Sequence, residues 1–183
     1  MVIKELANVS RPLLDLPVVR RTRRNHGLEH ATIHILSRRI KKLRMAGRSD
    51  AGGFFLLGDV PTETVESAAR EALRRMKAGD HELAIHPNCG TNLVTTASLA
   101  TGAAMLGFAG ADKKSAWNRM PWVMAMIAGA LVVGQPLGLT LQRYFTTDGD
   151  PGDLEIERIE RSEQSLVPGR APLVVHRVTT RLG

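Results

Sequence analysis

Two short strings of residues hold most of the side chains in this chain that could bind a metal ion. The first is His-Gly-Leu-Glu-His at residues 26–30, and the second is His-Pro-Asn-Cys-Gly-Thr at residues 86–91. In a helix, His26 and His30 would lie one turn apart, close enough to hold the same zinc ion. Glu29 would lie beside them, where a carboxylate can take a proton from a water molecule that the metal activates. The first string therefore predicts two zinc ligands and a general base.

The second string adds an imidazole and a thiol. His86 and Cys89 are three positions apart, in a turn that Pro87 and Gly90 hold rigid, so both side chains could reach one ion. The alternatives are that Cys89 is a small buried hydrophobic residue and that His86 makes a hydrogen bond in the turn. If the two strings meet in space, zinc is the predicted cofactor, and its predicted ligands are His26, His30, His86 and Cys89.

The number of ligands separates two classes of function. A zinc hydrolase keeps one coordination position open for water, whereas four protein ligands close the shell and make the ion structural. Both classes stay open at this point. The first is a zinc-dependent hydrolase, such as a peptidase, with Glu29 as its catalytic base. The second is a non-catalytic accessory or structural subunit of a membrane complex, in which the cluster is structural. His81 and His176 are expected to be ordinary surface or strand residues.

The elements that must position these strings predict a small mixed domain. Residues 1–20, which contain two prolines, are expected to be an irregular lead-in, and a helix at about 22–43 then carries the first string. An apolar strand at 54–57, a helix at 63–77 and a strand at 83–85 suggest a βαβ unit with a parallel pair of strands. The second string would then follow the second strand directly.

Two long stretches without charge follow the second string. Residues 90–111 and 120–142 contain no Asp, Glu, Lys or Arg, and about 20 apolar residues suffice to span a bilayer core of about 30 Å. The short basic loop between them has Trp117 and Trp122 at its edges, where interfacial tryptophans usually lie. This pattern predicts a two-helix transmembrane hairpin. The alternative is a pair of buried helices in a soluble protein, because several Thr and Ser residues weaken the first stretch.

The predicted fold class is therefore an α+β membrane protein with three parts. Residues 1–90 form a small α/β domain with the metal-site motifs, 91–143 form the hairpin, and 144–183 form a short polar C-terminal region. Within the last part, 154–164 could be a short charged helix. Residues 173–178 have the composition of a strand that could extend the small sheet.

Charge and composition indicate the partners. The net charge of +7 suits either an anionic membrane surface or nucleic acid. Aromatic residues are few and no recognition motif is present, so a lipid bilayer is the expected partner and nucleic acid is not. Small residues in the apolar stretches favour close packing with other copies of the chain or with another membrane protein. Without an apolar secretory segment at the beginning, we expect a multi-pass membrane protein whose N-terminal domain lies in the cytoplasm.

The two strings, followed at once by an apolar stretch, resemble a signature of uncharacterised bacterial membrane proteins. In those relatives, His-Gly-Ala-Glu-His-Lys is followed by His-Pro-Arg-Cys-Gly-Thr-Ser, and the resemblance covers about residues 25–94. This chain departs from the pattern, with Ala31 where the relatives carry Lys and Asn92 where they carry Ser. The resemblance implies an integral membrane protein of unknown function and supplies no reaction. His-x-x-Glu-His is also similar to the inverted zincin motif, in which the Glu precedes the second His.

Overall fold

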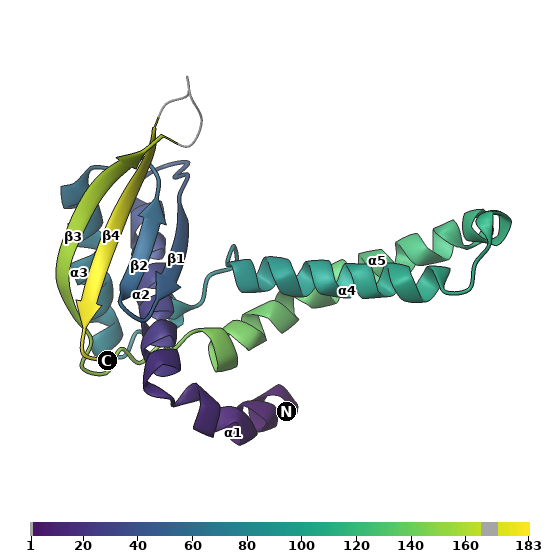
Figure 1. Ribbon diagram of the computed structural model, residues 1–183, viewed down its shortest axis with the longest axis horizontal. Coiled ribbons are helices and arrows are strands. Elements are labelled where there is room, and N and C mark those ends of the chain that lie inside the picture. Colours follow the sequence, from purple (N-terminus) through teal and green to yellow (C-terminus); the bar gives the residue numbers. More distant parts are fainter. Residues whose placement is uncertain (1, 166–171) are drawn as a thin grey trace. The chain divides into compact units, whose positions relative to one another are not determined.

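The computed structural model describes residues 2–165 and 172–183 (Figure 1). Two compact units contain these residues, one drawn from 1–86 and 143–183 and the other from 87–142. The elements of the first unit are α1 (Val2–Leu14), α2 (Pro17–Arg39), β1 (Ala46–Asp50), β2 (Gly53–Leu57), α3 (Thr62–Lys77), the 3-10 turn η1 (His81–Ala84), β3 (Glu155–Gln164) and β4 (Leu173–Arg181). The second unit consists of α4 (Gly90–Phe108) and α5 (Lys113–Leu141), and the short π-helix η2 (Gln142–Thr146) crosses the boundary between the units.

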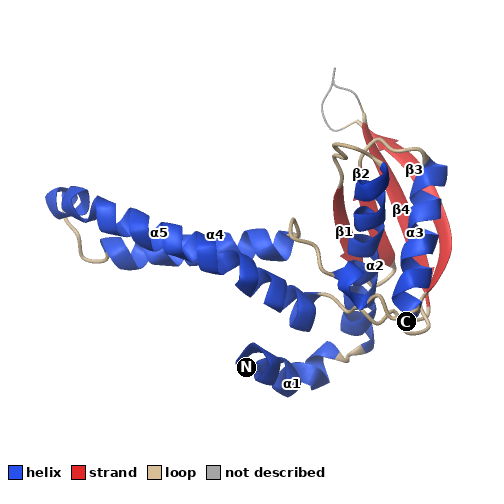
Figure 2. Ribbon diagram, turned by 180° about the vertical axis from the view of Figure 1, so that it is seen from behind, coloured by secondary structure: helices blue, strands red, loops and turns tan. Residues whose placement is uncertain are grey.

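The sheet of the first unit is antiparallel, so the predicted parallel βαβ unit is wrong. Its four strands lie in the order β1-β2-β4-β3, and α2 and α3 cover one face (Figure 2). The strand predicted at 83–85 is instead occupied mostly by η1, and the partner of β2 on its other side is β4, from the end of the chain. A pairing with a segment more than a hundred residues away leaves no local pattern in the sequence.

A β-bulge explains why the helix predicted at 154–164 is wrong. Ile156 and Ile159 are three positions apart, a spacing that suggests one face of a helix. In the structure this segment is β3, and its register with β4 shifts between Ile156 and Arg158. One extra residue at the bulge lets both isoleucines pack against the same core. The predicted irregular lead-in is also wrong, because α1 and the first turn of α2 occupy it.

The core lies between the sheet and the two helices that cover it. The helix predicted at 63–77 is confirmed as α3, and its buried stripe is Val65, Ala68, Ala69, Ala72 and Met76. From α2 and β2, Leu28, Leu36, Phe54 and Leu56 are fully buried against it. Burial of an aliphatic or aromatic side chain contributes about 1.5–3 kcal/mol, so this layer holds α2, and the first histidine string with it, on the sheet.

The second unit is a helical hairpin in which small residues allow close contact. A Cβ atom added at Gly134 would lie 2.7 Å from the Thr96 hydroxyl, and one at Gly138 would lie 2.4 Å from the Asn92 side-chain oxygen. The Gln142 side chain donates to that same Asn92 oxygen at 2.7 Å. Backbones can therefore approach each other at the open end of the hairpin.

The outer surface of the hairpin is apolar. Its exposed large hydrophobic side chains are Leu93, Val94, Met105, Leu106, Trp117, Trp122, Met124, Met126, Leu131, Val132 and Val133. One helical segment among the described residues, Lys113–Thr146, is long and apolar enough to cross a membrane, and α4 is not. The structure thus shows a helical hairpin with one long apolar helix, and its insertion as a transmembrane hairpin remains a prediction.

Replacing Gly138 by alanine is expected to destabilise the hairpin by about 1–3 kcal/mol, because overpacking forces a backbone shift. The added Cβ would lie 2.8 Å from the Asn92 Cα atom, which cannot swing away as a side chain can. The measurement is the thermal unfolding midpoint in detergent.

The matched control for this prediction is Gly129→Ala in the same helix, where an added Cβ meets nothing within 4 Å. It should leave stability unchanged or raise it by up to about 1 kcal/mol, since alanine favours helix. Equal midpoints for the two variants would contradict the packing described.

His176 makes stability depend on pH. It lies in β4, fully buried, and its Nδ1 atom has no hydrogen-bond partner among the described residues. Burial lowers the pKa of His176, and the nearby Arg161 charge lowers it further. The folded state thus favours the neutral ring, so its stabilisation is complete above about pH 6.5 and declines as pH falls toward the folded pKa.

The expected result is that His176→Leu reduces the slope of the unfolding free energy against pH between neutral and mildly acidic conditions, while His34 and His86, whose pKa values are also lowered, keep part of it. One proton contributes a slope of up to about 1.4 kcal/mol per pH unit. Exposed His81 supplies the control, and His81→Ala should keep the slope of the unmodified chain. If His176→Leu and His81→Ala gave the same slope, the pH dependence would have to come from other groups.

Candidate metal centre

α2 carries the first string and presents both of its histidines on one side. The ring centroids of His26 and His30 are 4.3 Å apart, as expected for imidazoles one helical turn apart. Gly27 between them is required by packing, because a Cβ atom there would lie 2.2 Å from the backbone oxygen of Asp148. The Asp148 amide also donates to the Arg23 carbonyl at 3.0 Å. The glycine of the motif thus lets the chain that follows η2 lie against α2.

Backbone carbonyls fix the orientation of both rings. Nδ1 of His26 lies 2.9 Å from the carbonyl oxygen of Thr146, and Nδ1 of His30 lies 2.7 Å from that of Ala84. A neutral imidazole next to a carbonyl must carry its proton on Nδ1, which leaves the lone pair on Nε2. Histidines that bind metals are usually held in this way, by a carbonyl or carboxylate on the nitrogen remote from the ion. The fold therefore prepares Nε2 of each ring as a ligand atom.

Two further histidines extend this group within the first unit. The His86 ring centroid is 5.8 Å from that of His30 and 4.9 Å from that of His34. Nδ1 of His34 lies 3.3 Å from the Leu83 carbonyl oxygen. Burial, together with the neighbouring His34 and His30, lowers the pKa of His86 to about 4. Burial likewise lowers the pKa of His34. Both rings are thus neutral at pH 7, the state in which imidazole binds metal.

Sequence reasoning did not include His34 among the candidate ligands. On a helical wheel it drifts from the buried face of α2 toward solvent, but in the structure η1 and the His86 ring lie against it. The signal that could have found it is the spacing: His26, His30 and His34 recur at every fourth position.

Cys89 is the third candidate ligand of the predicted site, beside the imidazoles of His26 and His30. The ligand atoms of His26, His30 and Cys89 all lie within 4.8 Å of one another. Cys89 is 6% exposed and caps the N-terminus of α4, where its sulfur accepts a hydrogen bond from the Thr91 amide at 3.4 Å. Two imidazoles and a thiol form a donor set that suits zinc. The residues present therefore fit the ion.

Glu29 faces the sheet. Its carboxylate accepts a hydrogen bond from the Ser49 hydroxyl of β1, and a Cβ atom at Gly47 would lie 2.0 Å from its other oxygen. Burial raises the pKa of Glu29, while the Ser49 hydrogen bond and the nearby His26 lower it. Glu29 is outside the group of three ligand atoms formed by the two histidines and the cysteine. Its predicted role as a catalytic base stays a prediction.

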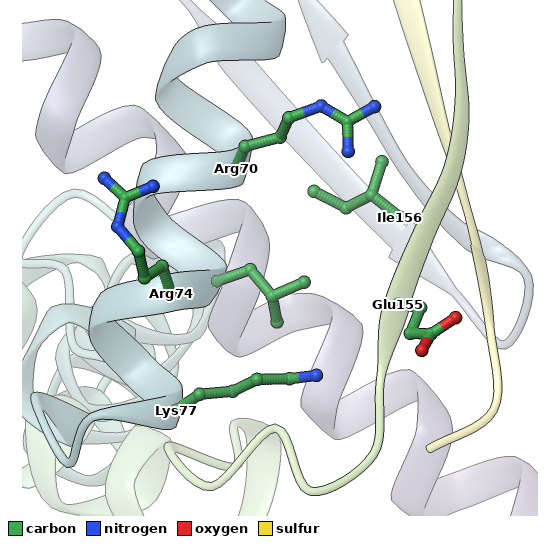
Figure 3. Close-up of a pocket in the computed structure, with 6 residues that line it drawn as sticks. Arg70, Arg74, Lys77, Glu155 and Ile156 are labelled. Atoms are coloured by element: carbon green, nitrogen blue, oxygen red, sulfur yellow. The ribbon is translucent and has the colours of Figure 1, made fainter.

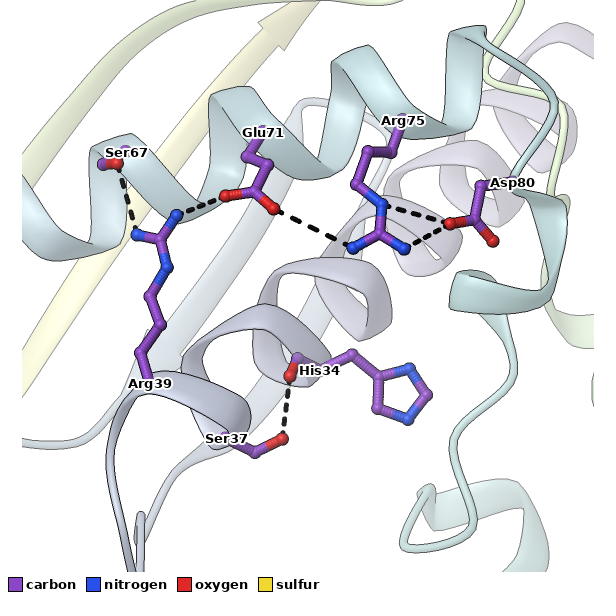
Figure 4. Close-up of polar contacts among 7 residues, drawn as sticks. All are labelled: His34, Ser37, Arg39, Ser67, Glu71, Arg75 and Asp80. Carbon is purple, nitrogen blue, oxygen red and sulfur yellow. Dashed lines mark hydrogen bonds and ion pairs between the residues drawn. The ribbon is translucent and has the colours of Figure 1, made fainter.

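Ionic contacts lie next to η1, which carries the carbonyl that orients His30. Figure 4 shows Arg39 at the end of α2 bound to Ser67 and Glu71 of α3, while Arg75 reaches both Glu71 and Asp80. Asp80 directly precedes η1, whose Leu83 and Ala84 carbonyls contact the rings of His34 and His30. Exposed pairs of this kind contribute only about 0–1 kcal/mol each. Their role is to fix the position of η1 against α2 and α3.

A basic groove lies between α3 and β3 on the first unit. It has a volume of ≈ 470 Å³ and is lined by Arg70, Leu73, Arg74, Lys77, Glu155 and Ile156 (Figure 3). Arg70 already pairs with Glu66 at 2.9 Å, and Glu155 already pairs with Arg181 at 2.7 Å. The Arg74 guanidinium points away from β3 in Figure 3. The lining of the groove contains no histidine or cysteine, so the groove is not a candidate metal site.

The known proteins that this chain resembles are themselves of unknown function. A family model described as a domain of unknown function (DUF6391) matches residues 21–159. An uncharacterized protein of Picosynechococcus sp. (SYNPCC7002_A1392) is 31% identical over 153 residues, which cover 76% of this chain and 72% of that protein. No solved structure matches the chain. The expected assignment to a family of unknown function is confirmed, while neither match names a membrane, a metal or the two strings. Since the model covers most of the chain and the relative aligns over a similar length, the chain belongs to the DUF6391 family.

Proposed function

We propose that this chain is a membrane-anchored zinc protein in which His26, His30 and Cys89 bind the ion. The observation that carries the proposal is the proximity of these three ligand atoms, together with the carbonyls that orient both rings. Zinc would bind Nε2 of each histidine and the cysteine thiolate. His86, next to His30 in the first unit, is the proposed fourth ligand.

The contacts of Glu29 with Ser49 and Gly47 support a non-catalytic role best. With His86 bound, the shell would contain four protein ligands, which is the arrangement of structural zinc sites. The Glu29 carboxylate, engaged by Ser49 and packed against Gly47, would then serve the packing of α2 on β1.

A hydrolase is the second candidate, and the group of three ligand atoms favours it. Hydrolytic zinc sites use three protein ligands and leave a position for water. If His86 stays out of the shell, Glu29 would take a proton from a water molecule at the site, and the oxygen would attack a carbonyl carbon of an ester or peptide. The leaving group would then receive that proton.

The membrane part of the proposal is supported by the apolar outer surface of the hairpin and by the length of its second helix. Soluble monomers seldom expose large continuous apolar patches, and eleven large hydrophobic side chains of the hairpin are exposed. We propose a multi-pass arrangement with the first unit in the cytoplasm, since residues 1–50 are rich in Arg and Lys and the cytoplasmic leaflet is anionic. The bilayer is the proposed partner, and other copies of the chain or another membrane protein would pack on the small residues of the hairpin.

Metal analysis of the detergent-purified chain tests the proposal. The unmodified chain should contain about one zinc ion per chain, and Cys89→Ser should lose most of it. Zinc-dependent hydrolysis of p-nitrophenyl acetate that disappears in Glu29→Gln, with zinc retained, would establish the hydrolase instead. A chain purified without chelators that contains no metal and takes up none would overturn the zinc site.

A further inference from the structure

α1 exposes its apolar face. Leu6, Val9 and Leu13 are 55%, 78% and 67% exposed, and they follow the spacing of one helical face. Leu16, in the turn after the helix, is 49% exposed and adjoins them. We call these four residues the α1 stripe.

The other side of α1 faces the rest of the first unit, and it is polar. Ala7 is buried, and around it Lys4, Asn8 and Arg11 line a hollow of ≈ 300 Å³. Arg23 of α2 lines the same hollow. A surface helix of a soluble domain turns its apolar stripe to the core and its polar residues outward. α1 does the reverse, so its stripe is arranged for an apolar environment outside the chain.

We infer that α1 is an interfacial helix whose stripe enters a lipid bilayer. This inference rests on the proposed membrane function. Helices that lie in the interface combine an apolar face with basic residues that stay in the headgroup layer. Lys4 and Arg11 remain exposed on α1, and the following turn of α2 adds two exposed valines, Val18 and Val19.

Charge also favours lipid over a second copy of the chain. Four arginines fall within residues 20–24, directly after the stripe, and the net charge is +7. Arg23 and Arg24 are engaged within the first unit, whereas Lys4 and Arg11 are exposed. Near an anionic surface each exposed basic residue contributes about 1 kcal/mol to binding, and two copies of a chain with this net charge would repel each other. A stable protein interface also buries about 800 Å² per partner, more than a few aliphatic side chains supply.

The test places a tryptophan on the stripe of the full chain. Trp117 and Trp122 are first replaced by Phe, and Val9→Trp is compared with Asn8→Trp, which lies on the polar side of the same helix. Each variant is reconstituted into vesicles of equal parts phosphatidylcholine and phosphatidylglycerol, with and without brominated acyl chains. The expected result is a blue-shifted Val9→Trp emission that is quenched by the brominated lipid. The Asn8→Trp emission should be quenched much less.

The outcomes distinguish this inference from the proposed function. A chain that floats with the vesicles but shows equal, weak quenching at both positions overturns the α1 inference and leaves the hairpin anchor in place. A Val9→Trp emission that shifts with protein concentration in detergent, without quenching in vesicles, overturns it in favour of a second copy. A chain that does not float with vesicles overturns both the inference and the proposed membrane function.

Discussion

Replacing His30 by alanine is expected to reduce bound zinc from about one ion per chain to less than about a tenth of that. His30 is the central ring of the group, with His26 on one side and His86 on the other. It is 3% exposed and its ring is oriented by the Ala84 carbonyl. The measurement is metal content by mass spectrometry after dialysis against a weak chelator.

The control for this prediction is His81→Ala, because His81 is an exposed histidine of η1 outside the group. It should bind zinc as the unmodified chain does. Loss of the His30 ring also leaves the buried Ala84 carbonyl without its donor, which costs about 1–3 kcal/mol. Thermal unfolding therefore accompanies the metal analysis, and His30→Gln serves as a second variant. Undiminished zinc in folded His30→Ala would contradict the proposed ligand set.

Replacing Val132 by arginine is expected to lower the fraction of chain that stays in membranes after alkaline extraction. Val132 lies near the middle of the long apolar helix and is 75% exposed. At the centre of a bilayer an arginine costs about 2.5–3.5 kcal/mol, a change of roughly a hundredfold in the insertion equilibrium. At an exposed position of a soluble protein, the same change costs about 0.5 kcal/mol or less.

Asn118→Arg provides a control with the same added charge on the same helix. Asn118 is exposed in the first turns of α5, close to Trp117 and Trp122. Arginine is tolerated at the membrane interface, so this variant should stay in membranes. If Val132→Arg and Asn118→Arg behaved alike, with full stability and unchanged fractionation, the hairpin would be a soluble pair of helices.

Parts of the fold could be predicted because their patterns are local. The apolar run of β2 and the buried stripe of α3 depend on neighbours within one element, and both are confirmed. The composition of the β4 segment also indicated a strand correctly. β3 was missed because a bulge gives a strand the three-residue spacing of a helix. β1, with the sequence Ala-Gly-Arg-Ser-Asp, has no apolar pattern to detect.

The residue types of the candidate metal centre could be predicted from the sequence. The backbone groups that orient these residues could not. Histidines at the first and fifth positions of a helical string must share a side, so the His26–His30 pair followed from sequence alone. The carbonyls that orient them come from Ala84 and Thr146, which are distant in sequence and carry no chemical signal. The direction of Glu29 toward β1 depends on Gly47, whose missing side chain makes room for a carboxylate.

Cobalt substitution tests the central claim most directly, because Co²⁺ replaces zinc and reports its ligands by absorption. The proposed site predicts that the cobalt-loaded chain shows a thiolate-to-cobalt charge-transfer band, and that Cys89→Ser removes this band. His30→Ala should bind no cobalt. A cobalt spectrum without the thiolate band, or one that is identical in the unmodified chain and Cys89→Ser, would contradict a metal centre shared by α2 and Cys89.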